Sequence, residues 1–557
     1  MRTFGFWEIG ICLGSGWWSL EFSRDMSIRF TIDGREVEVA EGQTIVDAAR
    51  QLGIDVPTLC YLERCGPMTS CLVCIVKLKF NGRISVVPSC GMKAQPGMIV
   101  ESETEEVRDM RRTALELLLS DHVGDCLSPC HRICPLRLNI PVMLRHVERG
   151  EMEKAIEIVR DVLPMPAITG RLCNHPCENG CRRGTWDESM HIRDIERNVG
   201  DAAMNSAHVP SRKPASGKSV AVIGAGPAGL AAAWQLVRDG HACVVFDRNA
   251  EPGGSLRRKA DEALLPRSVI EAEVRQLARL GVQFNPGVEL GIHVTLPALT
   301  DAFDAVLLAF GESAKSQAEL LGLQVTPTGI KANPESAQTP TALVFATGSA
   351  VKPVPQVTRA MSEGIAVARC VDQFLCGKPI RRAEKVFSSI MGRVERKEVE
   401  TFVRGVCSTN GGGTSCGSCG FVGDVDASTE ASRCLHCDCR AAGKCGLQHY
   451  AGMLGADPNR FRQQRRLFVQ QRHPANVLFE PGKCILCGIC VEIAKQAAEP
   501  LGLTFIGRGF DVRVGAPMDR QFEEGLRKVA AECVEGCPTG AIVFGSEASV
   551  PTPKASA

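Results

Sequence analysis

The chain has 557 residues, a formal net charge of +1 and a mean hydropathy close to zero. This length is more than one hydrophobic core usually organises, so we expect several domains. The balanced charge gives no sign of a nucleic-acid partner, and no apolar run reaches the roughly 18 residues that a membrane span requires.

The cysteines carry most of the information in this sequence. Eighteen of the 27 cysteines stand in five groups whose spacing suits metal ligands. Short C-x2-C and C-x3-C runs followed by proline favour metal binding over disulfides, and such ligands are typical of a reducing compartment. We therefore predict a cytoplasmic protein that binds iron–sulfur clusters.

Residues 1–25 are apolar and rich in tryptophan, but Glu8 interrupts any signal-like core and no clear small-residue cleavage site follows. We expect an N-terminal extension that results from a start codon assigned too early, with Met26 as the true start. The regular hydrophobic pattern begins only at that residue.

Residues 26–104 are predicted to form a small β-rich domain. Alternating apolar residues flank Asp33-Gly34, which is a hairpin signal, and Thr44 is placed to cap a helix. Four cysteines with C-x10-C-x2-C-x15-C spacing can enclose the two irons of a [2Fe–2S] cluster, with structural zinc as the alternative. The predicted ligands are Cys60, Cys71, Cys74 and Cys90. The pattern resembles the β-grasp, ferredoxin-like domain of the large iron–sulfur subunit of respiratory complex I and of iron-only hydrogenases.

Residues 105–212 are predicted to be helical, with two cysteine knots about forty residues apart. The knots are similar to the N-terminal domain of the glutamate synthase small subunit and of dihydropyrimidine dehydrogenase, which implies two [4Fe–4S] clusters that share ligands across both knots. Carried over to this chain, one cluster takes His122, Cys126, Cys130 and Cys181, and the other takes Cys134, Cys173, Cys177 and Glu196. His122 stands where the family has its first cysteine, and Glu196 matches a Glu or Gln position. For both, an exposed helix residue is the alternative.

Residues 213–380 are predicted to bind a dinucleotide. An apolar strand precedes Gly224, Gly226 and Gly229, a helix follows, and Asp247 ends a second strand 23 residues after the first of these glycines. Glycines permit a tight turn and close approach of the backbone to the pyrophosphate, which faces the helix N-terminus. The acidic side chain can bind the ribose hydroxyls.

The later glycine motifs are similar in order to the FAD domain of the glutamate synthase small subunit. This resemblance implies FAD as the cofactor and adds Gly253, Gly254 and Gly348 to the binding residues. The family has an Asp after the last of these, where this chain has Ser349. The family's NADPH-binding lobe has no counterpart, since about 30 residues separate Gly311 from Val344, whereas such a lobe needs on the order of 100. No second G-x-G-x-x-G occurs.

Residues 381–480 are predicted to be a linker with a cysteine-rich segment, and residues 481–557 a ferredoxin-like domain with a polar tail. The linker group of Cys434, Cys437, Cys439 and Cys445 has enough thiols for one [4Fe–4S] cluster, and its irregular spacing keeps zinc as the alternative. The last group resembles bacterial ferredoxin with one of its two clusters lost, because Ala494 replaces a ligand. The remaining cluster is predicted on Cys484, Cys487, Cys490 and Cys537, while Cys533, Cys416 and Cys419 have no assigned role.

The predicted fold class is multidomain α/β and α+β. It combines a β-grasp [2Fe–2S] domain, a helical double-cluster domain, a Rossmann-like FAD domain without an NADPH lobe and a ferredoxin-like C-terminus. The expected cofactors are FAD, one [2Fe–2S] cluster and three to four [4Fe–4S] clusters. No acid–base or nucleophilic catalytic set stands out, which suits an electron carrier.

We predict an FAD- and iron–sulfur-dependent oxidoreductase that works as an electron-transfer subunit. Its partners would be ferredoxin or the other redox subunits of a hydrogenase, formate dehydrogenase or heterodisulfide-reductase-like complex. The enzyme alternative is an NAD(P)H-dependent oxidoreductase of the glutamate synthase type, with a nicotinamide site that the sequence does not reveal. A third class, a zinc-rich scaffold without redox function, requires all five cysteine groups to bind zinc.

Overall fold

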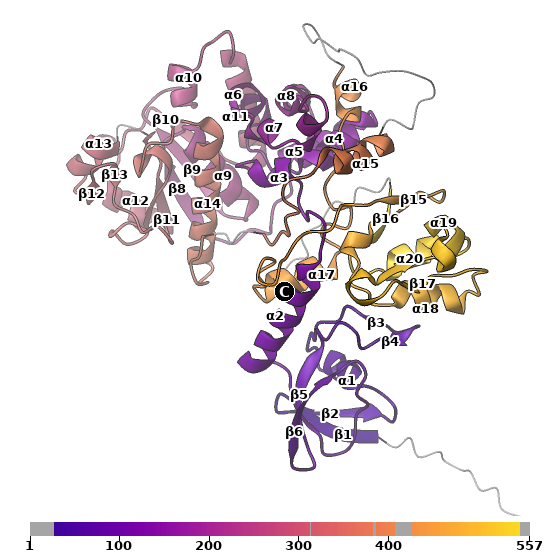
Figure 1. Ribbon diagram of the computed structural model, residues 1–557. Coiled ribbons are helices and arrows are strands. Elements are labelled where there is room, and N and C mark those ends of the chain that lie inside the picture. The colour runs from indigo at the N-terminus through magenta and orange to yellow at the C-terminus, as the bar shows by residue number, and fades with distance from the viewer. Residues whose placement is uncertain (1–26, 312–313, 383–385, 407–425, 546–557) are drawn as a thin grey trace, which may run out of the picture. The chain divides into compact units, whose positions relative to one another are not determined.

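The structure, a computed structural model, describes residues 27–311, 314–382, 386–406 and 426–545 (Figure 1). The described chain divides into two compact units. The first contains residues 27–61 and 66–111, and the second contains residues 62–65 and 112–545. The extension predicted over residues 1–25, together with Cys407, Cys416 and Cys419, lies outside the described residues.

The first unit is built on a five-stranded sheet in the order β2-β1-β7-β5-β6. Its strands are β1 (Ser27–Ile32), β2 (Arg35–Ala40), β5 (Ile75–Phe80), β6 (Arg83–Pro88) and β7 (Ile99–Glu101). β7 pairs parallel to β1 and antiparallel to β5. The hairpin predicted at Asp33-Gly34 joins β1 to β2, and both residues have the positive φ of a tight turn, 48° and 76°.

A single helix, α1 (Ile45–Gln51), packs its apolar side into the core of this unit. Thr44 caps it as predicted: its hydroxyl accepts a hydrogen bond from the Asp47 N–H, and the Asp47 carboxylate accepts one from the Thr44 N–H at 3.0 Å. This reciprocal pair is a capping box, which fixes where the helix begins. Two short strands, β3 (Tyr61–Leu62) and β4 (Gly66–Pro67), lie between α1 and β5 in the chain.

Short helices form the next part of the chain. They are α2 (Glu105–Ser120), α3 (Pro129–Ile133), α4 (Ile140–Glu148), α5 (Met152–Arg160), α6 (Pro166–Leu172), α7 (Pro176–Asn179), the 3-10 helix η1 (Arg182–Thr185) and α8 (Ile192–Ala203). Ile192, Ile195 and Val199 of α8 recur at helical spacing and are buried, so they form one apolar face. These side chains belong to a core that is continuous with the sheet that follows.

A parallel five-stranded sheet has the order β10-β9-β8-β11-β14. Its strands are β8 (Ser219–Ile223), β9 (Ala242–Asp247), β10 (Gln283–Pro286), β11 (Ala305–Leu308) and β14 (Val344–Ala346), and its helices are α9 (Pro227–Arg238), α10 (Ser255–Lys259), α11 (Arg267–Leu280), α12 (Leu296–Ala302) and α14 (Val357–Leu375). Strand order reverses beside β8, the point at which doubly wound sheets bind ligands. α9 and α14 lie side by side (Figure 1), and Gly364 permits this because a Cβ there would lie 2.1 Å from the Ala228 carbonyl oxygen.

The connection between β11 and β14 is short. Its described residues form α13 (Ala314–Leu320) and a hairpin of β12 (Val325–Thr326) and β13 (Gly329–Ile330). These elements contain far fewer residues than the roughly 100 that a second dinucleotide-binding lobe would need.

The last part of the described chain mixes helices with small sheets. Its helices are α15 (Arg396–Val406), α16 (Ala427–Ser432), α17 (Gly446–Met453), α18 (Ile489–Gln496), α19 (Phe522–Gly525) and α20 (Ala530–Gly536). β15 (Gln471–His473), β16 (Val477–Phe479) and β19 (Ile542–Phe544) form an antiparallel sheet, and β17 (Thr504–Ile506) pairs with β18 (Arg513–Gly515). α18 packs on α20.

The cysteines of the five groups are buried or half-buried. Among the described residues no two cysteines form a disulfide. Within the same ranges, no helix is both long enough and apolar enough to span a bilayer.

Glu273 on α11 is fully buried and ties α11 to the helical part of the chain. Its carboxylate accepts a hydrogen bond from the Ala167 N–H at 2.6 Å, and Arg160 lies 3.7 Å away. Burial raises the pKa of Glu273 to about 7, although Arg160 acts in the opposite direction.

Because this folded-state pKa is above that of the unfolded chain, the stabilising effect of neutral Glu273 is lost as the pH rises through about 7. Through this group alone, the free energy of unfolding should fall by about 1 kcal/mol between pH 6 and pH 8. We expect Glu273→Gln to remove that fall, as measured by urea unfolding of variant and wild type at both pH values. An equal fall in the two proteins would exclude Glu273 as its source.

Candidate iron–sulfur and dinucleotide sites

The first unit brings together its four predicted cluster ligands, Cys60, Cys71, Cys74 and Cys90, none more than 4% exposed. The sulfurs of Cys74 and Cys90 lie 3.3 Å apart, and the Cys60 sulfur accepts a hydrogen bond from the Cys71 N–H at 3.5 Å. Leu72 has a φ of 55°, which turns the backbone between two of the thiols. Four buried, converging thiols fit the donor set of a [2Fe–2S] cluster.

Contact between these thiols changes their acidity. A hydrogen bond from Cys71 lowers the pKa of Cys60 to about 2, and one from Cys90 lowers the pKa of Cys74 to about 6. Hydrogen bonds to Cys60 in turn raise the pKa of Cys71 and of Cys90. Thiolate is the form that binds iron, so contacts that lower the pKa of Cys60 and Cys74 favour ligation at this site.

In the second unit, Cys134, Cys173, Cys177 and Glu196 lie together, as predicted for one [4Fe–4S] site. Burial and the neighbouring Cys134 and Glu196 raise the pKa of the Cys177 thiol, and burial with Glu196 raises that of Cys173 to about 11. Glu196 reaches this group from α8, which packs tightly on α6, since a Cβ on Gly170 would lie 2.5 Å from the Arg197 Cα. Its carboxylate accepts a hydrogen bond from the Thr169 hydroxyl at 2.6 Å, and burial raises its pKa to about 7.

Cys130 and Cys181 line a cavity together with Cys434 and Cys437. His122 and Cys126, which were predicted to share a cluster with Cys130 and Cys181, are not among its lining residues. The grouping therefore differs from the predicted one. The physical reason is that the segment around Cys434 packs on the helical part of the chain from far along the sequence.

Cys126 lies instead with Cys439 and Cys445. Burial and the Cys439 thiol raise the pKa of Cys126 to about 11, and burial with the other two thiols raises that of Cys445 to about 12. Lys483 is a charged neighbour of Cys126, Cys439 and His122 alike. Burial lowers the pKa of His122 to about 3, so its imidazole is neutral, which is the form that binds metals.

A second cavity is lined by Cys484, Cys487, Cys490 and Cys537, the set predicted from the ferredoxin resemblance. Cys533 is not among its lining residues; its thiol lies 3.9 Å from the Cys490 carbonyl oxygen. The cysteine that the prediction left without a role thus lies beside the site without lining it.

The arrangement of these groups bears on the choice between clusters and single ions. Among the residues that the structure describes, no three His, Cys, Asp or Glu side chains are placed to hold one metal ion. A cubane cluster takes its thiolates at separate corners, so its ligands lie farther apart than those of a single zinc ion. Cys434 and Cys437 have neighbours different from those of Cys439 and Cys445, an arrangement that does not fit one tetrahedral zinc site for all four.

A pocket lies at the carboxyl end of the parallel sheet and has about 1260 Å³ of space not filled by protein, its open mouth included. Of the predicted binding residues, Gly224, Gly226, Asp247 and Gly254 line it, and so does Ser349. The Asp247 carboxylate accepts hydrogen bonds from the Ala225 N–H at 2.7 Å and from Asn249, which hold it at the end of β9. The position and lining fit a dinucleotide.

The other predicted glycines act through packing. A Cβ on Gly229 would lie 1.9 Å from the Gly224 carbonyl oxygen, and one on Gly348 would lie 2.8 Å from the Ala228 Cβ. Gly253 has a φ of 134°, a conformation that other residues rarely adopt. Gly226 differs: a Cβ there would meet no protein atom within 4 Å, so the space beside it remains for a ligand.

The N-terminal turn of α14 connects this pocket to the nearest cysteine group. Val357 and Ala360 line the pocket, and the side chain of the intervening Thr358 lies close enough to Cys173 to lower the pKa of its thiol, against the larger effect of burial. One turn later, the Ser362 hydroxyl donates to the Pro135 carbonyl, next to Cys134, at 2.9 Å. A helical turn rises only about 5.4 Å, so the pocket and the cysteine group are immediate neighbours.

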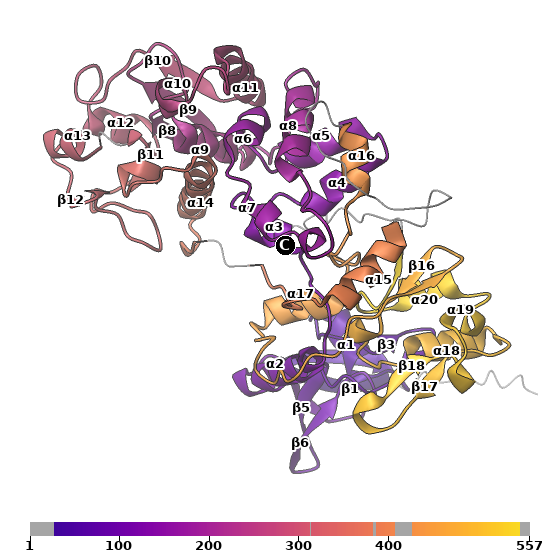
Figure 2. The ribbon, with the colours of Figure 1, turned by 45° about the horizontal axis from the view of Figure 1, so that its top comes forward.

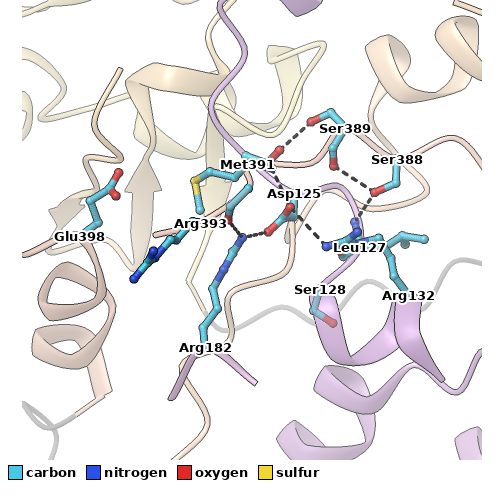
Figure 3. Close-up of polar contacts among 12 residues, drawn as sticks. Asp125, Leu127, Ser128, Arg132, Arg182, Ser388, Ser389, Met391, Arg393 and Glu398 are labelled. Carbon is cyan, nitrogen blue, oxygen red and sulfur yellow. Dashed lines mark hydrogen bonds and ion pairs between the residues drawn. The ribbon is translucent and has the colours of Figure 1, made fainter. Parts of the chain in front are cut away.

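A buried carboxylate fixes the loop that carries Cys126 (Figure 3). Asp125 is fully buried and accepts a hydrogen bond from the Met391 N–H at 2.9 Å while its other oxygen pairs with Arg182. Ser389 donates to the Gly124 carbonyl at 2.6 Å, and its own N–H donates to the Cys126 sulfur at 3.4 Å. These bonds hold Cys126, which follows Asp125 in the chain, and through Arg182 they also hold the segment next to Cys181.

Three segments match family models. Residues 25–105 match the 2Fe-2S iron-sulfur cluster binding domain, residues 119–208 match dihydropyrimidine dehydrogenase domain II with its 4Fe-4S cluster, and residues 222–281 match the NAD(P)-binding Rossmann-like domain. The predicted resemblance is confirmed. The chain is a mixed α/β, multidomain protein with domains of the 2Fe-2S, 4Fe-4S and Rossmann-like types.

Full-length relatives share only part of this chain. The NADP(+)-dependent formate dehydrogenase subunit beta of Moorella thermoacetica is 34% identical over 35% of this chain and 31% of its own length. The glutamate synthase [NADPH] small chain of Mycobacterium tuberculosis is 38% identical over 36% of this chain and 42% of its own length. The NADPH-Fe(3+) oxidoreductase subunit beta of Geobacter sulfurreducens is 34% identical over 33% of this chain and 28% of its own length. The chain thus spans less than half the length of each relative it matches.

Several site residues were not predicted from the sequence. Thr358 and Thr169 lie in ordinary helical stretches, and no local motif distinguishes them. The partners of Cys130 and Cys181 were also assigned differently. One signal for the latter was present, because the first cysteine of the family knot is missing here and a ligand from elsewhere could replace it.

We expect Gly226→Ala to weaken dinucleotide binding without unfolding the domain. The φ of −83° and ψ of −179° at this position suit alanine, and the added methyl group would occupy ligand space only. An overlap costing about 1–3 kcal/mol would lower affinity roughly tenfold to a hundredfold. The measurement is dinucleotide released on heating, together with the unfolding temperature.

Gly229→Ala is the matched comparison, because its methyl group would collide with the Gly224 carbonyl oxygen. It should lower both dinucleotide content and unfolding temperature. Full dinucleotide retention in Gly226→Ala would contradict the assignment of this pocket.

Proposed function

We propose that this protein is an iron–sulfur flavoprotein that works as the electron-transfer subunit of an oxidoreductase. FAD would occupy the pocket of the parallel sheet, and electrons would pass between it, the clusters and partner redox proteins. The observation that carries this proposal is the shared turn of α14, which lines the pocket with Val357 and places Thr358 beside Cys173.

The residues at this turn have separate tasks. Val357 and Ala360 present apolar atoms to the pocket, while Thr358 and Ser362 hold the cysteine group from the same helix. Thr358 is only 6% exposed, so this contact excludes water. A bound flavin supplies electrons singly to clusters and in pairs to a substrate, and nearby protein groups tune it.

The finer fold assignment is part of the same proposal. The mixed sheet of the first unit with its single helix supports a β-grasp [2Fe–2S] domain. The antiparallel sheet of β15, β16 and β19 with α18 and α20 supports a ferredoxin-like C-terminus. The Rossmann-like sheet with its short β11–β14 connection supports an FAD domain without an NADPH lobe.

Three cysteine groups would keep the ligands predicted from the sequence. These are the [2Fe–2S] set of Cys60, Cys71, Cys74 and Cys90, the [4Fe–4S] set of Cys134, Cys173, Cys177 and Glu196, and the [4Fe–4S] set of Cys484, Cys487, Cys490 and Cys537. The remaining thiols would serve further [4Fe–4S] clusters. A chain with this many reduced thiols would work in the cytoplasm.

Partners are proposed from the relatives. Two of them are named as beta subunits, of a formate dehydrogenase and of an NADPH-Fe(3+) oxidoreductase. We propose that this chain likewise passes electrons to or from another redox subunit, which would contribute the substrate site.

A specific observation supports an alternative. The family model for residues 222–281 is named for NAD(P) binding, and the relative from Mycobacterium tuberculosis is named for NADPH. A nicotinamide cofactor could therefore enter the same pocket, which would make the chain itself a dehydrogenase of the glutamate synthase type.

We expect the protein, reconstituted anaerobically with iron, sulfide and FAD, to bind flavin that dithionite bleaches and that neither NADPH nor NADH bleaches. The reason is that the described chain offers one dinucleotide pocket, which FAD would fill. Flavin absorbance after each addition is the measurement. Prompt bleaching by NADPH or NADH would favour the dehydrogenase alternative, and a lack of bound flavin would contradict the flavoprotein proposal.

A further inference from the structure

Four cysteines from three distant segments line one cavity. Cys130 lies on α3, Cys181 precedes η1, and Cys434 and Cys437 follow α16. The cavity has about 360 Å³ of space not filled by protein, its opening included, and its other lining residues include Leu144, Met190 and Ile192 as well as Arg182 and Arg183. A thiol-lined space with mainly apolar neighbours suits an iron–sulfur cluster.

The segment that carries Cys434 is firmly docked. Figures 1 and 2 both show α16 beside α4 and α8, although these helices are far apart in sequence. The Arg183 guanidinium donates to the Arg433 carbonyl at 2.8 Å, and the Glu430 carboxylate accepts from the His191 N–H at 2.9 Å. Arg433 directly precedes Cys434 and Arg183 lies two residues after Cys181, so this bond holds both thiols against the same cavity, and the Glu430–His191 bond holds the flanking chain.

A buried ion pair holds the other end of the segment. Asp438 pairs with Arg145 of α4, and the two side chains are 10% and 6% exposed. Removing either partner would leave an uncompensated charge in the interior, so this contact keeps the position of Asp438 well defined. Its neighbour Cys437 then faces the cavity, while Cys439 on the other side of Asp438 lies with Cys126 and Cys445.

The Cys434–Cys437 loop has the local geometry of the ferredoxin loop Cys484–Cys487. In the first, His436 has a φ of 45° and donates its N–H to the Cys434 sulfur at 3.5 Å. In the second, Leu486 has a φ of 55° and donates its N–H to the Cys484 sulfur at 3.4 Å. Hydrogen bonds to sulfur of this kind are a feature of iron–sulfur sites.

The two cavities are also alike in their lining. Each is lined by four cysteines, and in each a C-x2-C pair contributes two of them; in the ferredoxin-like cavity Cys490 continues that run. The ferredoxin-like site thus serves as an internal reference for the other.

We propose that Cys130, Cys181, Cys434 and Cys437 together bind one [4Fe–4S] cluster. Cys439 and Cys445 then belong to a separate site with Cys126, so the C-x2-C-x-C-x5-C run supplies two sites rather than one. Each thiol gives up its proton when it binds iron. The ligand set rests on the proposed iron–sulfur function and is independent of the flavin and of any partner.

Iron counting in double variants tests this grouping. Cys181→Ala and Cys434→Ala should each lower the iron of the reconstituted full chain by about four atoms, the content of one cubane. If both thiols serve one cluster, the double variant should also lack only about four atoms. A loss of about eight would place the two thiols in different clusters and overturn the proposal.

The reciprocal pair is Cys434→Ala with Cys439→Ala. Because these residues are assigned to separate sites, the double variant should lose about eight iron atoms, and a loss of about four would show that one cluster holds the whole run. Cys370→Ala is the control, since Cys370 is buried on α14 outside every group and should leave the iron content unchanged.

Bound dinucleotide and the iron of the other clusters report whether each variant folds. Should the alanine variants fail this check, the same pairs are made as serine variants and read by electron paramagnetic resonance of the reduced protein. One altered cluster signal in Cys181→Ser with Cys434→Ser supports the proposal, and two altered signals overturn it. Wild-type protein that binds no iron would instead contradict the proposed iron–sulfur function.

Discussion

The arrangement of the cysteine groups in the second unit depends on the buried ion pair between Arg145 and Asp438. Asp438 stands between two cysteines that belong to different groups, so the pair that holds it decides which thiol faces which site. Burial alone would raise the pKa of the Asp438 carboxylate, but the charge of Arg145 keeps that pKa below its usual value. Burying the Arg145–Asp438 pair costs desolvation energy, but the pair fixes the position of the segment that carries Cys437 and Cys439.

A single helical turn also has two contacts at the dinucleotide pocket. One turn of α14 provides both the apolar lining of the pocket and the hydroxyl that contacts Cys173. The close packing of α14 on α9 at Gly364 therefore positions the glycine loop and the nearest cysteine group together. In the proposed function a flavin in the pocket and a cluster on the cysteine group would lie a short distance apart, as electron transfer requires, and a single helix contact would set that distance.

Burial shapes the chemistry of every group. It raises the pKa of Cys130, Cys177 and Cys434, so these thiols remain protonated until a cation replaces the proton. The [2Fe–2S] site differs, since sulfur–sulfur hydrogen bonds already lower the pKa of Cys60 and Cys74. The fold thus keeps most of its candidate ligands neutral and apolar in the absence of metal, which suits their place in or beside the hydrophobic core.

The sequence by itself determined the local features. The Asp33-Gly34 hairpin, the Thr44 cap, the glycine loop before α9 and the ligand spacing within each knot depend on residues close in the chain, whose geometry local rules describe. It also placed Glu196 beside Cys134, through a family resemblance. Only the tertiary structure decided that Cys434 and Cys437 face Cys130 and Cys181, while Cys126 lies with Cys439 and Cys445. Which buried thiols meet is set by the docking of α16 and its flanking residues, and no local pattern encodes a contact between segments nearly 300 residues apart.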